Sequence, residues 1–323
     1  MRTRCSFGGG RRAGWVLATL AAVALLPVTA FGAERVVLCE EFTATWCSHC
    51  ANAGQRFSQL MNNYPDVFAF VQIHHGDNYA TAWGNQRANF YGLTGYPTDW
   101  FDGVISHIGE KPYSVYEAAL LARLSIATDV TIDLTAVETA AQTYEFTANV
   151  CLQPGGTAKT LRIYMVQVLD FWPIPPAYSR NGFRQAAATQ DVNLTPGNCV
   201  QVVRTFTFPT TPDWDSKENI KVIAWAQMPY SQAPAEVHQA AMLQYPFNPC
   251  GNQALGDANC DGTVDGFDIQ PFVLALTDPN SWIAQYPNCD ILCVCDANCD
   301  GTVDGFDIQY FVGCLTNGSC ECP

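Results

Sequence analysis

The chain has 323 residues, 15 cysteines and a formal net charge of −14. Because an excess of acidic side chains repels a phosphate backbone, this composition excludes a nucleic-acid partner. The length accommodates about two or three domains, and so many cysteines are typical of an oxidising compartment.

Residues 1–33 are typical of a secretory signal peptide, because a basic region precedes an apolar stretch over 15–31 and small residues at Gly32 and Ala33. The basic region holds Arg2, Arg4, Arg11 and Arg12. A membrane anchor is the alternative, but the stretch is at the short limit for a span and contains Pro27. We therefore expect an exported protein, whether periplasmic, cell-surface or secreted, with no membrane span in the mature chain.

A Cys-x-x-Cys pair, Cys47 and Cys50, lies between an apolar run over 36–42, predicted as a strand, and a helix-like segment. A helix N-terminus stabilises the thiolate that attacks a disulfide, and two intervening residues let the second cysteine resolve the mixed disulfide. The alternatives are a structural disulfide or half of a zinc site, which needs two further ligands. For those ligands only His74 and His75 are near. The placement favours a redox-active pair.

Two separated segments carry a resemblance to a known family. One is 41–50, which ends with the cysteine pair, and the other is 91–98, which contains Tyr96-Pro97. Together they resemble the thioredoxin family over residues 34–126, which implies a thioredoxin-like α/β fold. The hydrophobic pattern predicts strands at 36–42, 66–73, 98–101 and 104–108, and helices at 51–61, 79–91 and 113–124.

The resemblance implies roles for individual residues. Cys47 is expected to be the attacking thiol and Cys50 the resolving one. Glu41 is similar to the family's buried acid, the proton acceptor for the resolving thiol; the alternative is a partly exposed strand glutamate. Pro97 is expected to be cis and to pack against the disulfide, with the Tyr96 backbone pairing an extended substrate; the alternative is a structural turn proline.

Three neighbouring features carry further expectations. His49 replaces the proline common in the family, and its possible charge near Cys47 should make the pair more oxidising; a solvent-facing histidine is the alternative. Cys39 is expected to be a buried, inert thiol. His74 and His75 are placed in a polar loop, with a substrate groove or a metal site as alternatives.

Over residues 127–248 apolar and polar side chains alternate along the chain, which predicts an all-β, immunoglobulin-like sandwich. The expected strands are 131–137, 144–152, 161–169, 200–208, 220–228 and 236–243. Cys151 and Cys199 are positioned to bridge, and the apolar loop over 171–176 is expected to pack on its own sandwich. The region shows no catalytic constellation.

Residues 249–323 contain the same fourteen-residue segment twice, at 257–270 and 296–309. Each copy fits a twelve-residue calcium loop that runs into an apolar helix face. The metal-ligand candidates are Asp257, Asn259, Asp261, Thr263, Asp265, Asp268, Asp296, Asn298, Asp300, Thr302, Asp304 and Asp307. Oxygen ligands of this kind predict two Ca²⁺ sites.

Duplicated loop–helix units with Asp at position 12 resemble type I dockerins, small α modules with paired EF-hand-like loops. This resemblance implies a cohesin-like partner that binds through the helices. The surrounding cysteines depart from the family pattern and are expected to staple the module, with a connectivity that the sequence leaves open.

The sequence therefore predicts a multidomain, exported thiol-disulfide oxidoreductase. It would act on extracytoplasmic protein thiols or disulfides through Cys47 and Cys50, without an organic cofactor, and attach to a partner by its C-terminal module. Oxidation, reduction and isomerisation all stay open. The alternative is a non-enzymatic binding or structural component that the same module anchors to a scaffold.

Overall fold

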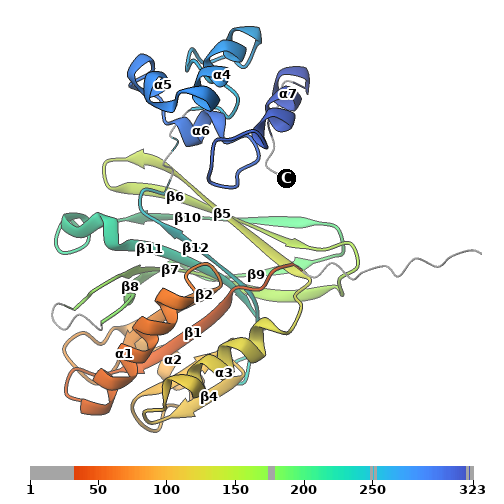
Figure 1. Cartoon of the computed structure of the whole chain (residues 1–323). Coiled ribbons are helices and arrows are strands. Elements are labelled where there is room, and N and C mark those ends of the chain that lie inside the picture. Colours follow the sequence, from red (N-terminus) through yellow and green to blue (C-terminus); the bar gives the residue numbers. More distant parts are fainter. Residues whose placement is uncertain (1–32, 174–178, 248–249, 251–252, 318–319, 321–323) are drawn as a thin grey trace, which may run out of the picture. The chain divides into compact units, whose positions relative to one another are not determined.

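The computed structural model describes residues 33–173, 179–247, 250, 253–317 and 320 (Figure 1). Apart from Ala33, the expected signal peptide lies outside the described residues. Among the helices in these ranges, none is long and apolar enough to cross a membrane.

The first part of the described chain is a mixed α/β unit. Its elements are β1 (Val37–Thr43), α1 (Ser48–Asn63), β2 (Phe68–His74), α2 (Ala82–Tyr91), β3 (Thr98–Phe101), β4 (Ile105–Ile108) and α3 (Tyr113–Leu124). Strand β1 lies between a parallel β2 and an antiparallel β3, and β4 continues the hairpin. This order confirms the thioredoxin-like fragment expected from the sequence.

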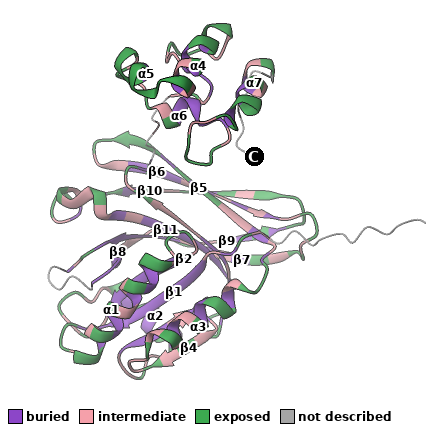
Figure 2. Cartoon of the chain, viewed as in Figure 1, coloured by how far each residue is buried: buried purple, intermediate pink, exposed green. Residues whose placement is uncertain are grey.

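Strands β1 and β2 are buried at every position, because helices cover both faces of the sheet (Figure 2). This explains their continuous apolar runs. On one face Phe57 of α1 and Tyr116 of α3 pack against Phe70 and Phe101. Helix α2 packs on the other face and ends at Gly92, whose φ of 63° is the left-handed conformation that favours glycine.

The middle part is built almost entirely from strands. Its elements are β5 (Val130–Ala140), β6 (Thr143–Leu152), β7 (Lys159–Leu169), β8 (Gly182–Ala186), β9 (Gln190–Leu194), β10 (Cys199–Thr207), the 3₁₀ helix η1 (Trp214–Asn219), β11 (Ile220–Gln227) and β12 (Val237–Gln244). Strands β10, β6 and β5 form one sheet. The expected bridge between Cys151 and Cys199 is confirmed, joining paired positions of β6 and β10.

The remaining strands of the middle part do not form a sandwich of their own. They continue the α/β sheet, whose order is β12-β11-β7-β8-β2-β1-β3-β4, with β9 pairing β7. The junction is a parallel contact between Gln72 of β2 and Gly182 of β8. The sequence predicted separate domains at 34–126 and 127–248, but the large sheet contains strands from both ranges. Strands β8 and β9 were not predicted, because both are short and largely polar.

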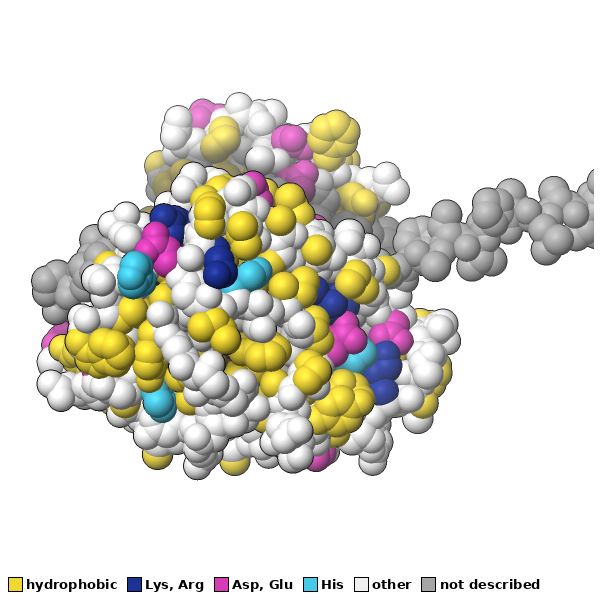
Figure 3. Space-filling view, turned by 90° about the horizontal axis from the view of Figure 1, so that it is seen from below, with side chains coloured by type: hydrophobic (Ala, Val, Ile, Leu, Met, Phe, Trp, Pro, Cys, Tyr) yellow, Lys and Arg dark blue, Asp and Glu magenta, His cyan; other side chains and the backbone are white. Residues whose placement is uncertain are grey.

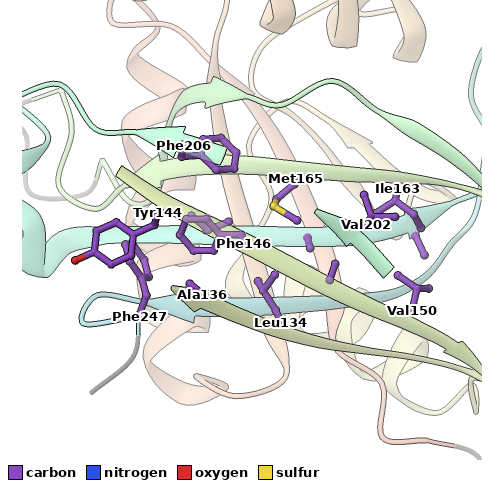
Figure 4. Packing of buried hydrophobic residues seen from close by; sticks show 14 of the residues in the cluster. Leu134, Ala136, Tyr144, Phe146, Val150, Ile163, Met165, Val202, Phe206 and Phe247 are labelled. Carbon is purple, nitrogen blue, oxygen red and sulfur yellow. The ribbon is translucent and has the colours of Figure 1, made fainter. Parts of the chain in front are cut away.

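The three-stranded sheet packs on the large one through a second apolar core (Figure 4). Phe146 and Phe206 reach into this layer from β6 and β10 and meet Ile163 and Met165 of β7. The alternating burial along β6 and β10 is the pattern of strands with one solvated face.

Buried charges tie the N-terminal strands to β12. Asp102 accepts hydrogen bonds from Arg35 at 2.9 Å and from Arg123 at 2.8 Å. Arg35 also donates to the carbonyl of Val237 at 3.0 Å, and Arg123 donates to Glu236 at 2.5 Å. Removing one member of such a buried set leaves another charge unpaired, at a cost of about 3–5 kcal/mol.

The C-terminal part is a small helical module with its own core. Its elements are η2 (Gly266–Asp268), α4 (Ile269–Thr277), α5 (Pro279–Gln285), α6 (Ile291–Cys295) and α7 (Asp307–Asn317). Phe272 and Phe311, at equivalent positions of the repeat, stack with ring centroids 3.8 Å apart. Disulfides join Cys250 to Cys293, Cys260 to Cys289 and Cys314 to Cys320. The disulfide content fits an extracytoplasmic protein.

Candidate functional site

Cys47 and Cys50 form a disulfide at the start of α1. Cys47 is the N-cap of the helix, and its Sγ accepts a hydrogen bond from the Cys50 backbone N–H at 3.1 Å. Cys50 is buried and Cys47 is partly exposed. The Cys47 sulfur, the outer one of the pair, is therefore the more accessible and is also the one that the helix N-terminus stabilises.

Glu41 is fully buried on β1, so the alternative of a partly exposed glutamate is wrong. The Gln72 side-chain N–H donates to Glu41 Oε2 at 2.9 Å, and Glu41 Oε1 has no partner among the described residues. Burial raises the pKa of Glu41 to about 8, although the Gln72 hydrogen bond opposes the rise. The carboxyl group therefore holds a proton at neutral pH.

His49 is exposed and forms a specific contact. Its Nδ1 lies 2.9 Å from Glu110 Oε2, and Glu110 also meets Asn52 and Arg56. The hydrogen bonds from His49, Asn52 and Arg56 lower the pKa of Glu110 to about 2. Glu110 was not identified from the sequence, because it lies far from the cysteine pair along the chain. The predicted effect of His49 on Cys47 stays a prediction.

Pro97 is buried, and the Tyr96–Pro97 peptide bond is cis as expected. Tyr96 contacts His75 through its hydroxyl group, and the Trp46 ring meets the Tyr96 ring edge-on at 5.2 Å. Trp46 is 62% exposed and donates to the carbonyl of Gly76 at 3.0 Å. Aromatic surface thus borders the disulfide.

Viewed from the side of α1, α3 and β4, the surface mixes apolar side chains and histidines with few charges (Figure 3). This face carries little of the strong negative charge of the chain. Beneath the surface, Cys39 is a buried free thiol, as expected. Burial and the neighbouring carboxyl groups raise the pKa of Cys39, which makes this thiol unreactive.

A cavity of about 260 Å³ opens beside the disulfide. Its walls come from the β1–α1 turn, from β2, and from the segment between β7 and β8. The lining residues include Cys47, Cys50, Gln72, His74, Pro173 and Ser179. A larger groove of about 870 Å³, lined by Arg180 and Lys221 among others, has no cysteine in its walls and offers no comparable chemistry.

The contribution of the β7–β8 segment to the cavity was not expected. The apolar loop over 171–176 was predicted to pack on its own sandwich, with contact to a partner as the alternative. Trp172 does pack against the core of the middle part, and Pro173 in addition lines the cavity. The Trp172 ring packs edge-on against His74 at 6.1 Å and against Tyr79 at 5.1 Å. Gly182 permits this approach, because a Cβ there would lie 2.4 Å from the Trp172 carbonyl oxygen. Residues 174–178 of the same loop lie outside the described residues.

The two candidate calcium loops adopt the same conformation. The first aspartate of each loop accepts N–H bonds from positions 5 and 6: Asp257 from Asp261 and Gly262, and Asp296 from Asp300 and Gly301. The last aspartate likewise accepts two backbone N–H bonds at 2.7–3.1 Å in each copy. The cysteines at position 4 of the two loops, Cys260 and Cys299, have φ angles of 56° and 59°.

The loop donors fit a hard cation in chemistry. They are oxygen ligands, Asp257 and Asp268 are buried, and residues 251–323 contain no Lys or Arg to neutralise them. Burial raises the pKa of Asp268, and the nearby carboxylates of Asp257 and Asp261 add to the rise. In the described ranges, however, no three His, Cys, Asp or Glu side chains lie close enough to hold a metal. The two Ca²⁺ sites therefore stay a prediction.

No protein-family model matches the chain, and no curated protein matches it. Solved structures give weak matches. A protein from Agrobacterium tumefaciens has 16% identity and a TM-score of 0.42, covering 65% of this chain and 95% of its own. A putative thiol:disulfide interchange protein DsbE from Chlorobium tepidum has 20% identity and a TM-score of 0.24, covering 28% of this chain and 82% of its own.

The exposed lipoprotein thioredoxin Etrx1 from Streptococcus pneumoniae has 16% identity and a TM-score of 0.24, covering 28% of this chain and 86% of its own. Each of these TM-scores is below 0.5. The roles assigned below therefore rest on the residues of this chain alone.

Proposed function

We propose that this protein is an exported thiol-disulfide oxidoreductase that exchanges its Cys47–Cys50 disulfide with extracytoplasmic protein thiols. One observation carries the proposal: the disulfide lies at a helix N-terminus, with Cys47 partly exposed, beside a cavity whose lining residue Gln72 donates a hydrogen bond to the buried Glu41. A structural disulfide needs neither the cavity nor a carboxyl group that keeps its proton at neutral pH.

In the oxidising direction a substrate thiolate attacks Cys47 Sγ. A substrate–Cys47 disulfide forms, the Cys47–Cys50 bond breaks, and its electron pair leaves on Cys50 Sγ. Glu41, protonated at neutral pH, supplies the proton that Cys50 needs. A second substrate thiol then attacks the first substrate sulfur, and Cys47 leaves. The reverse sequence reduces a substrate disulfide.

The surface around the disulfide supports a polypeptide substrate. Trp46 provides exposed aromatic area, and its ring packs edge-on against the half-buried Tyr96. In this proposal the Tyr96 backbone, before the cis peptide bond of Pro97, pairs an extended chain. This arrangement uses no organic cofactor. A purely binding or structural role for the same fold predicts that the two cysteines can be replaced without loss of function.

Single-cysteine variants of the full chain test the proposal. Cys47→Ser should abolish dithiol oxidation and insulin reduction, whereas Cys50→Ser should trap mixed disulfides on Cys47. Cys39→Ser is the matched control, because Cys39 is a buried free thiol outside the pair. Full activity in Cys47→Ser would exclude the proposed enzyme and favour the non-enzymatic alternative.

We further propose that the C-terminal module binds two Ca²⁺ ions and attaches the enzyme to a cohesin-like partner. Support comes from the paired loops with buried carboxylates that no Lys or Arg of this segment neutralises. The end of each loop and the helix after it carry exposed apolar side chains at equivalent positions, which suit a protein partner. They are Phe267, Ile269 and Val273 in the first copy, and Phe306, Ile308 and Val312 in the second.

A further inference from the structure

His74, the last residue of β2, lines the disulfide cavity with one ring nitrogen unused. Its side chain is only 5% exposed. Nε2 is buried and has no hydrogen-bond partner among the described residues. A buried polar atom without a partner is costly, and such atoms in native structures call for an explanation.

The contact of the other ring nitrogen selects the tautomer of the imidazole. His74 Nδ1 lies 2.7 Å from Asp77 Oδ2. Asp77 also accepts N–H bonds from Thr45 at 2.8 Å and from Tyr79 at 2.9 Å. Partial burial raises the pKa of Asp77, but these hydrogen bonds outweigh it and bring the pKa below its usual range.

An ionised carboxylate accepts hydrogen bonds only, so the proton of the neutral imidazole lies on Nδ1. The lone pair is then on Nε2, the buried ring nitrogen that has no hydrogen-bond partner among the described residues. A carboxylate that orients a histidine in this way prepares the other nitrogen to act as a base. The sequence placed His74 in a polar loop, because Asp77 and the cavity become its neighbours only in the fold.

We propose that His74 is a second proton-transfer residue of the disulfide site, an inference that rests on the proposed exchange reaction. Nε2 takes the proton of the thiol that enters the cavity, and the resulting thiolate attacks Cys47. When Cys47 later leaves the mixed disulfide, the imidazolium returns that proton to its sulfur. Glu41 serves Cys50, and the second substrate thiol restores the proton to Glu41.

The residues around the His74 ring are consistent with His74 acting at Cys47 and Glu41 acting at Cys50. Trp172 packs on the ring and limits its movement. The charged and titratable groups around the cavity and on its packed elements are Asp77, Tyr79, Glu41, Cys47, Cys50 and, over the Trp172 ring, Arg184. Arg184 is already paired with Asp213, so Asp77 is the charge that acts directly on His74.

The test measures how fast dithiothreitol reduces the Cys47–Cys50 disulfide of the full chain across a range of pH. Alkylation and mass spectrometry of the peptide that carries both cysteines distinguish this disulfide from the others. At neutral pH His74→Gln should react about 100-fold more slowly than wild type, a typical loss for general acid–base catalysis. The ratio should fall toward one in alkaline solution, because a thiol that is already ionised needs no base.

Asp77→Asn should show a smaller loss with the same pH trend. His238→Gln, a histidine on β12 outside the cavity, should react like wild type. An unchanged rate in His74→Gln, or a loss of the same size at every pH, overturns the proposal. If His74→Gln does not fold, Asp77→Asn decides by the same criterion. Dithiothreitol needs no natural substrate, so failure of the enzyme to turn over protein thiols would contradict the proposed function without altering this readout.

Discussion

Glu41 of β1 and Asp99 of β3 stand directly opposite each other in an antiparallel pair, and both are fully buried. Their partners differ: Glu41 meets the uncharged Gln72 amide, whereas Asp99 lies 2.7 Å from Nδ1 of His107. Burial raises the pKa of both acids, and the charge of Asp99 adds to the rise at Glu41. The fold therefore keeps a proton on Glu41 at neutral pH.

The raised pKa of Glu41 predicts a stability that falls with pH. The folded pKa is about 8 against an ordinary 4.5, so between these values the folded chain binds the proton that the unfolded chain releases. Stability is therefore lost as the pH rises through this window, by on the order of 4 kcal/mol from this group. Glu41→Gln should flatten the pH dependence measured by denaturant unfolding. Glu145→Gln, an exposed site on β6, should leave it unchanged; a parallel curve for Glu41→Gln would contradict the assignment.

The local part of the site was predictable from the sequence. Cys47, Cys50 and Pro97 belong to short patterns in which neighbouring residues set the backbone, and Glu41 followed from the resemblance to the thioredoxin family. What the sequence could not supply depends on contacts between distant segments. The two regions were expected to be separate because the sequence pattern changes between them. The short strand β8, which pairs with β2 through Gln72 and Gly182, leaves no signal of the sheet that joins them.

The neighbours of the predicted residues were missed for the same reason. Glu110 meets His49 across 61 positions of the chain, and Trp172 reaches His74 from a loop assigned to another domain. Neither contact leaves a periodic signal. The repeats at 257–270 and 296–309 show the opposite case, because identical segments predict identical loops without knowledge of the fold.

His49 gives a prediction about the redox potential. His49 lies two positions after Cys47, and a positive charge on its ring would stabilise the thiolate, so the pair should be more oxidising than the thioredoxin value of about −270 mV. His49→Pro should lower the potential, measured by equilibration with glutathione. Glu110 holds the imidazole at 2.9 Å, so Glu110→Gln should shift the potential as well, whereas His238→Gln should not. A potential unchanged by His49→Pro would show that the imidazole has no influence on Cys47.

The core between the two sheets should be required for stability and not for the chemistry. Phe146 is fully buried, with the Phe206 ring 5.6 Å away and the Phe247 ring 4.9 Å away. Phe146→Ala should therefore reduce the free energy of unfolding by about 3–5 kcal/mol. Val137→Ala, at a 61% exposed position of β5, should change it by less than about 0.5 kcal/mol. A shift of the Cys47–Cys50 potential in folded Phe146→Ala would contradict this separation.

The C-terminal loops should bind two Ca²⁺ ions and be stabilised by them. Each loop segment contains four aspartates and no cationic side chain, so a cation that gathers these carboxylates would offset their repulsion and favour the folded form. Flexible oxygen ligands in this number suit Ca²⁺ better than Mg²⁺, which demands a tighter octahedral geometry. Calorimetric titration of the full chain with its disulfides intact should give a stoichiometry of two.

Single substitutions assign the two calcium sites. Asp257→Ala and Asp296→Ala should each remove one site and leave the Cys47 exchange rate unchanged. Asp278→Asn is the matched control, because this aspartate lies outside both loops and caps α5, a role that asparagine can keep. The disulfides from Cys250 and Cys260 restrain the module without metal, so binding and not folding is the measurement that decides. Absence of measurable Ca²⁺ binding in wild type would end the dockerin-like interpretation, whatever the cysteine pair does.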